Sequence, residues 1–371
     1  MSSRVSCRRL AALALLATAP PGCRCGREAR SQPMYHPPIE NVPDAPWAPV
    51  HNPKLGPGVR PADTLRLGRT LADTLSLGFV TALGQAGGHL VVADQFADPH
   101  LAVIELATEL VEGRLGRHGK GPREFDVPYA LDVASHDPPT VWVYDFGNQR
   151  FTLLAEDARG VWHVSVVLGL DVGAQLTEPV WLGVGIISNG LLLDHTLLYL
   201  DSAGVPQRRV RGAPPFGPAQ MSAPHGRFQL NVNHMAVRPA RDRIAIAYQY
   251  ANRLDFFVAS GRRVQSVEGP RAIRVRYGLD PQSGRLLFGR DSERAYVALR
   301  ATGDRVYALY CGRCSRDEPP SVLHVFRWTG EFEREVAIVP GTWAFTLTAD
   351  GSQLIGSYEE ADGTPRIGEW W

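Results

Sequence analysis

The sequence lacks a charge excess of either sign, and this excludes one broad class of partner. Its 371 residues include 39 lysines and arginines against 38 aspartates and glutamates, which gives a formal net charge of +1. Proteins that bind nucleic acid carry a clear basic excess, because they must neutralise phosphates. We therefore expect no nucleic-acid partner.

Familiar catalytic signatures are also missing. The sequence contains no His-Glu-x-x-His motif of zinc proteases and no Gly-x-Ser-x-Gly nucleophile elbow. A P-loop needs Gly-Lys followed by Ser or Thr at the start of a helix. Here Lys120 precedes a glycine and a proline, and the residues beyond alternate as in a strand. We expect neither a phosphate cradle nor a catalytic constellation.

Long apolar runs are absent, whereas chain breakers are abundant. The sequence has 37 glycines and 29 prolines, and its apolar runs are short and rich in β-branched and aromatic residues. Many breakers between short runs of this kind are typical of an all-β chain with many turns.

The first 22 residues have the pattern of an export signal. A basic region comes first, with Arg4, Arg8 and Arg9. The apolar core that follows, Leu10–Ala19, is too short to span a bilayer. Pro-Pro-Gly-Cys then ends at Cys23 and resembles a bacterial lipobox, although Pro20 stands where a lipobox has leucine. Lipidation of Cys23 would make an outer-membrane-associated lipoprotein, and cleavage after Ala19 would instead release the protein into the periplasm.

Residues 23–63 are rich in proline and show no apolar periodicity. Such segments are extended and have no apolar face with which to build a core. We interpret this segment as a tether between a lipid anchor and a folded domain at residues 64–371. A leader without a role is the alternative.

A repeat runs through the folded region. Each unit has a short apolar run, a polar turn and a second apolar run, the pattern of a β-hairpin. The first runs end near residues 94, 145, 194, 249, 311 and 359. Most hairpins have a further alternating run before and after them, so each unit has four strands, as in the blades of a β-propeller.

We predict a six-bladed β-propeller of four-stranded blades, with a seven-bladed or irregular ring as the alternative. The last unit supplies only three strands before the chain reaches Trp371. Residues 66–78 precede the first unit and can supply the missing outer strand. Pairing of this N-terminal strand with the last blade would close the ring and remove its exposed edges.

Three motifs resemble those of the bacterial six-bladed propellers, exported and often lipidated members of the NHL-like and TolB-like group. The sequence LGRHGKGPREF is similar to their Gly-Arg-x-Gly-x-Gly-Pro-Gly-Glu-Phe signature, although Arg123 replaces a glycine. The matching residues are Gly116, Arg117, Gly119, Gly121, Pro122, Glu124 and Phe125. A strand followed by Asp145, Asn148 and Arg150 resembles the NHL core, and Asp350-Gly351 resembles a TolB-type turn. The resemblance implies the fold and no single activity.

We interpret the signature as a connection between two blades. Gly119 and Gly121 permit a tight path, and Pro122 stiffens it. Glu124 can accept hydrogen bonds from loop amides, and Phe125 can pack between blades.

Asp145, Asn148 and Arg150 have two interpretations. Asp and Asn in tight turns usually bind their own backbone, which favours a structural clamp across the hairpin. Contact with a ligand or a metal is the alternative.

Cys311 and Cys314 lie in one loop, and in an exported protein such a pair favours a disulfide. The alternatives are free thiols, metal ligation and redox catalysis. A redox pair normally opens a helix in a βαβ context, and zinc needs further ligands.

Asp132, Asn231 and His234 lie in predicted inner strands and are the residues that hint at a ligand or metal in the central channel. His234 is also consistent with a structural role. We expect no cofactor; calcium or zinc would apply to the alternative function below.

The signature connection and the hairpin turns should share one face of the ring, and loops on a rigid scaffold are where binding usually resides. The leading hypothesis is a monomeric, exported, lipid-anchored binding module for a protein, peptide or glycan at the cell envelope. The alternative is a metal-dependent hydrolase or lyase with its site in the channel, and a third option is a spacer.

Overall fold

The chain divides into two units, Met1–Met34 and Tyr35–Trp371. The computed structural model describes residues 39–40, 52–56, 61, 63–170, 172, 176–190, 196–210, 229–230, 232–280, 282, 286–314, 320–360 and 362–371. The export signal, Cys23 and Asn231 therefore lie outside the described residues. Within the described part of the chain, no helix is long and apolar enough to cross a membrane.

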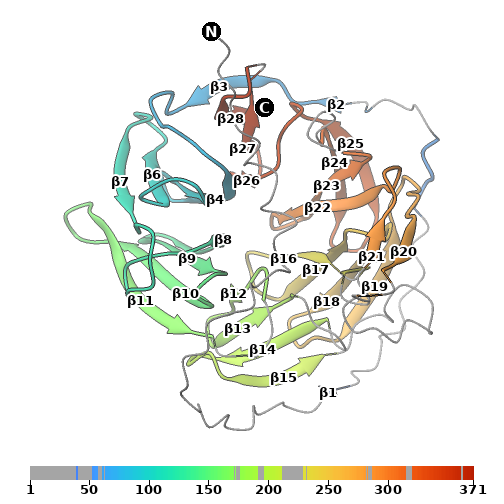
Figure 1. Cartoon of the computed structure of the whole chain (residues 1–371), viewed down its shortest axis with the longest axis horizontal. Coiled ribbons are helices and arrows are strands. Elements are labelled where there is room, and N and C mark those ends of the chain that lie inside the picture. Colours follow the sequence, from blue (N-terminus) through green and yellow to red (C-terminus); the bar gives the residue numbers. More distant parts are fainter. Residues whose placement is uncertain are drawn as a thin grey trace. The chain divides into compact units, whose positions relative to one another are not determined.

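The second unit is a six-bladed β-propeller (Figure 1), which confirms the predicted fold. Each blade is an antiparallel sheet whose core is four strands, ordered from the ring axis to the rim. Blade 1 consists of β4 (Val80–Ala86), β5 (His89–Asp94), β6 (Leu101–Glu105) and β7 (Val111–Leu115). Blade 2 consists of β8 (Pro128–His136), β9 (Pro139–Asp145), β10 (Arg150–Glu156) and β11 (Trp162–Gly169). Blade 3 consists of β12 (Val180–Trp181), β13 (Gly185–Ser188), β14 (Leu197–Asp201) and β15 (Pro206–Val210).

The remaining three blades follow the same order. Blade 4 consists of β16 (Asn233–Val237), β17 (Arg243–Tyr248), β18 (Arg253–Val258) and β19 (Arg263–Glu268). Blade 5 consists of β22 (Arg294–Ala301), β23 (Arg305–Gly312), β24 (Val322–Arg327) and β25 (Phe332–Ala337). Blade 6 consists of β26 (Phe345–Leu347), β27 (Leu354–Glu359), β28 (Pro365–Trp370) and β3 (Leu67–Leu71).

The ring closes in blade 6, where the first long strand pairs with the last. β3 lies antiparallel to β28, with Leu71 opposite Ile367, as predicted. Arg69 on β3 reinforces this closure, because its Nε lies 2.5 Å from the Glu369 carboxylate and its Nη1 lies 2.9 Å from that of Glu109 in blade 1. Because β3 and β28 pair, the edges that these two strands would otherwise leave unpaired are satisfied by one another.

The hydrophobic core lies between the blades. Six of the seven clusters of buried apolar side chains in the described residues combine residues from two neighbouring blades. The seventh consists of Leu230 and Leu286, which lie in connections between blades. Between blades 2 and 3, for example, Trp142 stacks on Phe151 at 4.6 Å and packs with Leu200. A single blade has an apolar surface on both faces, so stability depends on the complete ring.

The predicted position of blade 3 was wrong. Its second strand, β13, ends at Ser188, whereas the sequence pattern placed that end near residue 194. Two apolar runs follow one another there, and the earlier one forms the strand. The inner strand β12 has only two residues, so this blade is shorter than its neighbours near the ring axis.

The sequence did not predict three short elements, which are one hairpin and two strands of two residues each. A hairpin of β20 (Tyr277–Leu279) and β21 (Leu286–Phe288) lies in the connection from blade 4 to blade 5. β1 (Ile39–Glu40) pairs in parallel with β15, and β2 (Asp63–Thr64) pairs in parallel with β25. The described parts of the proline-rich segment therefore lie along the rim of blades 3 to 5.

Candidate functional site

The two ends of the blades carry different connections. Because the strands of a blade are antiparallel, the connection to the next blade lies at the same end as the turn between the second and third strands. We call this end the crossing face, and the end with the first and third turns the turn face. Asp145, which ends β9, accepts hydrogen bonds from the amides of Asp126 and Val127, which end the connection from blade 1.

The buried Asp145 carboxylate organises the signature connection. It accepts hydrogen bonds from the amides of Asp126 at 3.1 Å and Val127 at 2.9 Å. It also accepts one from Nδ2 of Asn148 at 2.7 Å, and the same nitrogen donates to the Gly119 carbonyl at 2.9 Å. Asp145 and Asn148 thus fasten both ends of the connection.

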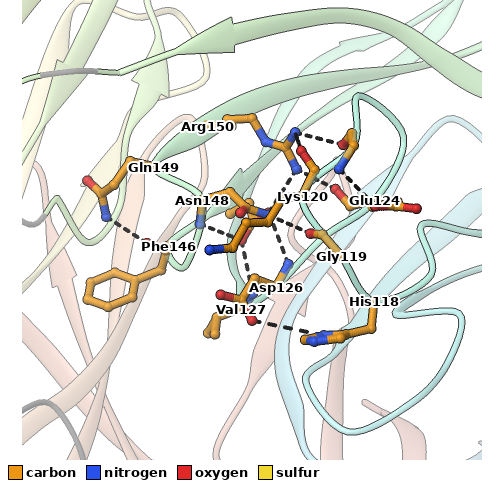
Figure 2. Close-up of polar contacts among 12 residues, drawn as sticks. His118, Gly119, Lys120, Glu124, Asp126, Val127, Phe146, Asn148, Gln149 and Arg150 are labelled. Atoms are coloured by element: carbon orange, nitrogen blue, oxygen red, sulfur yellow. Dashed lines mark hydrogen bonds and ion pairs between the residues drawn. The ribbon is translucent and has the colours of Figure 1, made fainter. Parts of the chain in front are cut away.

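Arg150 fastens the middle of the connection. Its Nη1 donates to the carbonyls of Lys120 at 3.1 Å and Gly121 at 2.7 Å, and its Nη2 donates to the carbonyl of Glu124. Its Nη2 also lies 3.4 Å from the Asp145 carboxylate (Figure 2). The side chains of Asp145 and Arg150 are therefore engaged by the protein's own groups.

The connection is filled from within by Glu124 and Phe125. Glu124 accepts a hydrogen bond from the Gly121 amide at 2.8 Å, and this bond lowers the pKa of its carboxyl. A Cβ atom at Gly119, where φ is +152°, would lie 2.1 Å from that carboxylate. Phe125 is buried between blades 1 and 2. A carboxylate here leaves no place for a phosphate.

Blade 1 also has an aspartate at the end of its second strand that binds backbone amides, but the residues after it differ from those after Asp145. Asp94 ends β5 and accepts hydrogen bonds from the amides of Gly78, Phe79 and Phe96. In blade 3, Asn189 takes the same role and accepts a hydrogen bond from the amide of Glu178 at 3.1 Å. An Asp or Asn at the end of a second strand is the sequence signal that locates these caps.

Cys311 and Cys314 are joined by a disulfide in the turn between the second and third strands of blade 5. Arg294 donates to the Cys314 carbonyl at 3.0 Å. The staple therefore belongs to the crossing face.

Asp132 lies on the inner strand β8 and is held in an ion pair. Its carboxylate lies 2.8 Å from Nη1 of Arg241 and accepts a hydrogen bond from the Trp181 amide at 2.8 Å. Burial raises the pKa of Asp132, and Arg241 opposes that rise. Arg241 comes from the first turn of blade 4 and also donates to the Val133 carbonyl, so it links blade 4 to blade 2 past the short inner strand of blade 3.

His234 on β16 faces Glu178, which sequence reasoning missed. His234 Nδ1 lies 3.3 Å from Oε1 of Glu178, whose Oε2 accepts hydrogen bonds from the Met235 amide and from Asn189. Burial raises the pKa of Glu178, but His234 and the amide outweigh that effect and the net shift is downward. The described residues contain no group of three or more His, Cys, Asp or Glu side chains arranged to hold a metal.

A second residue that the sequence did not indicate is Arg300 on β22. Its Nη1 donates to the Leu299 carbonyl at 2.7 Å, and its guanidinium lies 5.8 Å from the centre of the Phe345 ring. Burial lowers the pKa of Arg300, and the charge of Glu178 opposes that shift. No spacing rule marks this arginine, because its surroundings come from other blades.

Two aromatic pairs lie where the crossing face meets the ring axis. Phe79 and Phe96 of blade 1 are 6.0 Å apart, and Tyr129 and Phe146 of blade 2 are 5.7 Å apart. Phe96 is 55% exposed and Tyr129 is 37% exposed. Burial, with the nearby charge of Glu178, raises the pKa of Tyr129 to about 12.

No protein-family model matches the chain, and no curated protein matches its sequence. Solved structures are similar in fold. A Bacteroides fragilis protein that is named as exported shares 10% identity over 86% of this chain and 98% of its own, with a TM-score of 0.56. A member of the DUF4221 family from Bacteroides vulgatus shares 10% identity over 83% of this chain and 97% of its own, with a TM-score of 0.54. Similarity at this identity shows the propeller fold alone.

Proposed function

We propose that this protein is an exported, lipid-anchored propeller that binds a protein, peptide or glycan partner at the cell envelope. It would belong with the NHL-like and TolB-like exported propellers. Export is supported by the N-terminal signal pattern and by the name of the similar Bacteroides fragilis protein. Cys23 is the proposed lipid attachment site.

The aromatic side chains at the axis end of the crossing face carry the proposal. Phe96 and Tyr129 present exposed rings on neighbouring blades, each beside a second ring. Aromatic residues dominate binding surfaces because they bury a large area with few rotatable bonds. The Thr81 hydroxyl donates to the Pro128 carbonyl at 2.6 Å and joins the two blades beneath them.

The bridge between Arg241 and Asp132 supports approach from the crossing face. It spans from blade 4 to blade 2 on the side of the ring that carries the first turns. A partner that reaches toward the ring axis from the turn face would have to displace a buried ion pair, whose disruption is costly.

A binding screen with the full-length lipoprotein, extracted from membranes in detergent, tests the proposal. The immobilised protein is screened for binding to envelope proteins, peptide libraries and glycan arrays. We expect a partner whose affinity falls at least tenfold in the double variant F96A/Y129A and is unchanged in V161A/V184A on the turn face. Loss of binding in the turn-face variant, or hydrolytic turnover without a stable partner, would contradict the proposal.

Lipidation has its own test. Intact-mass measurement of the membrane fraction should show the mass of a chain that begins at Cys23 and carries acyl groups. A soluble chain that begins at residue 20 would instead support cleavage after Ala19.

A further inference from the structure

Arg300 differs from the other arginines that contact the core. Arg241, Arg253 and Arg271 each lie within 2.8 Å of a carboxylate. Among the described residues, Arg300 has no carboxylate bound to it, and its partners are a backbone carbonyl and an aromatic ring. Partly buried charges in proteins are normally paired, because desolvation without compensation is unfavourable. The lack of a bound carboxylate at Arg300 therefore requires an explanation.

Arg300 lies on an inner strand that is next to the strand carrying His234. It belongs to β22 of blade 5, which packs against β16 of blade 4. The Glu178 carboxylate contacts His234 and the Met235 amide on β16, and its charge opposes the effect of burial on the pKa of Arg300. Because inner strands line the ring axis, Arg300 and His234 come from neighbouring strands at that axis.

No hydrogen bond or ion pair joins Glu178 to Arg300 among the described residues. The Glu178 carboxylate accepts hydrogen bonds from the Met235 amide and Asn189, and it contacts Nδ1 of His234. The other nitrogen of that imidazole, Nε2, is buried and has no hydrogen-bond partner among the described residues. When Nδ1 donates to Glu178, Nε2 of the neutral ring is an acceptor. Arg300 therefore offers donors, and His234 an acceptor, that no described group of the protein uses.

We propose that Arg300 binds the carboxylate of a ligand at the ring axis, with His234 as the second polar contact. A guanidinium fork matches a planar carboxylate and forms two parallel hydrogen bonds to it. The charge of Glu178, which lies against β16, disfavours a phosphate dianion, so a group with a single negative charge fits better. A sugar acid and the end of a peptide share this chemistry. This inference deepens the proposed function by naming the charged group that its binding face accepts.

The test uses the full-length protein and two matched pairs of probes. D-galacturonate is compared with galactose, and N-acetylglycine with N-acetylglycinamide, by titration calorimetry at low salt. We expect at least one acid to bind with a dissociation constant of about 1 mM, typical of one good polar contact, and its neutral analogue to bind at least tenfold more weakly. The preferred pair identifies the source of the carboxylate. Equal binding of acid and neutral forms, binding of neither acid, or tighter binding of inorganic phosphate would overturn the proposal.

Variants separate a ligand site from a structural role. R300M should weaken binding of the acid at least tenfold, whereas R123M, in the exposed signature connection, should leave it unchanged. Because R300M removes a charge without a bound counterion, it should also raise the melting temperature by about 2–4 °C. A lower melting temperature would show that Arg300 is structural and would refute the site. If the protein binds its partner through Phe96 and Tyr129 but binds no acid, this inference is refuted and the proposed function is not.

Discussion

The crossing face and the turn face both expose apolar side chains, but of different kinds. On the turn face these are aliphatic residues at separate turns, namely Leu110, Val161, Val184 and Val205, together with Leu67 and Trp371 where blade 6 closes. On the crossing face they are mostly aromatic, namely Phe96, Tyr129, Tyr277 and Leu287. Single exposed aliphatic residues are ordinary on protein surfaces. The kind and grouping of the side chains, rather than exposure itself, distinguish the two faces.

The two faces also differ in how their connections are held. On the crossing face, buried carboxylates reach distant backbone amides and arginines, as Asp145 and Glu335 do. On the turn face, exposed carboxylates bind amides two to four residues away, as Asp157 and Asp201 do. Crossing connections therefore depend on neighbouring parts of the ring, whereas the turns capped by Asp157 and Asp201 are held by their own residues. Four experiments test this difference between the crossing face and the turn face.

The largest effect should come from D145A. This substitution leaves the amides of Asp126 and Val127 without their acceptor and leaves Arg150 without its carboxylate. Loss of one partner from a buried network of this type costs about 3–5 kcal/mol. Urea denaturation followed by tryptophan fluorescence measures the free energy of unfolding.

The matched control for D145A is D157A on the turn face. Asp157 caps only the amides of Arg159 and Val161 at an exposed turn. Its removal should cost much less than that of Asp145. Equal losses in the two variants would show that both faces are held in the same way.

Acid should weaken the crossing face through Glu335. Burial raises the pKa of Glu335, but Arg271 and the buried His324 lower it more, to about 2 from an ordinary value of 4.5. Because the pKa is lower in the folded state, this stabilisation is complete above about pH 4.5 and is lost as the pH falls toward 2. The contribution is about 3 kcal/mol.

Unfolding free energies measured across this pH window in the wild type and in E335Q check the effect. The variant should lose the part of the pH dependence between about 4.5 and 2 that is due to Glu335, about 3 kcal/mol. E331Q, at an exposed ion pair with Arg327, is the control, because such pairs contribute little. An identical acid profile in E335Q and the wild type would rule out this role for Glu335.

The disulfide between Cys311 and Cys314 should have a smaller effect. It closes a loop with a sequence separation of only 3 residues, and the chain-entropy benefit of so short a loop is about 2 kcal/mol or less. The double variant C311S/C314S should lose at most this amount. Wild-type protein treated with a reductant is the comparison, and reduction without any change in stability would show that the staple is dispensable.

The smallest effect on stability should come from F96A/Y129A, the variant that the binding screen uses. Phe96 is 55% exposed and Tyr129 is 37% exposed, so we expect each substitution to lower the free energy of unfolding by about 1 kcal/mol or less. Differential scanning calorimetry checks this. A large destabilisation would mean that the aromatic pairs serve the fold of the crossing face rather than a partner.

The repeat made most of the fold predictable. Alternating runs and turns gave the all-β class, six blades and the closure of blade 6, because these depend on local patterns and on a strand that lacks a partner. Blade 3 was misplaced because two apolar runs compete within it. β1 and β2 have only two residues each and therefore leave no periodic signal.

The candidate site was less accessible to sequence reasoning. Asp145, Asn148 and Arg150 lie within six residues of one another, so their turn pattern is visible in the sequence. Arg241 and Asp132 are 109 residues apart, and Glu178 and His234, which contact one another, are 56 residues apart. Such pairs are set by the closure of the ring and the length of inner strands, which no local spacing encodes.

The closure of blade 6 also imposes an order in time. Arg69 and Glu369 are 300 residues apart in the chain, and a ribosome makes β3 long before it makes β28. During synthesis β3 therefore has no partner strand until β28 is made, and blade 6 is the last blade of the ring to be completed. The six residues of β28 are needed to pair with β3 and close the ring. A chain that ends before β28 therefore cannot form the complete propeller.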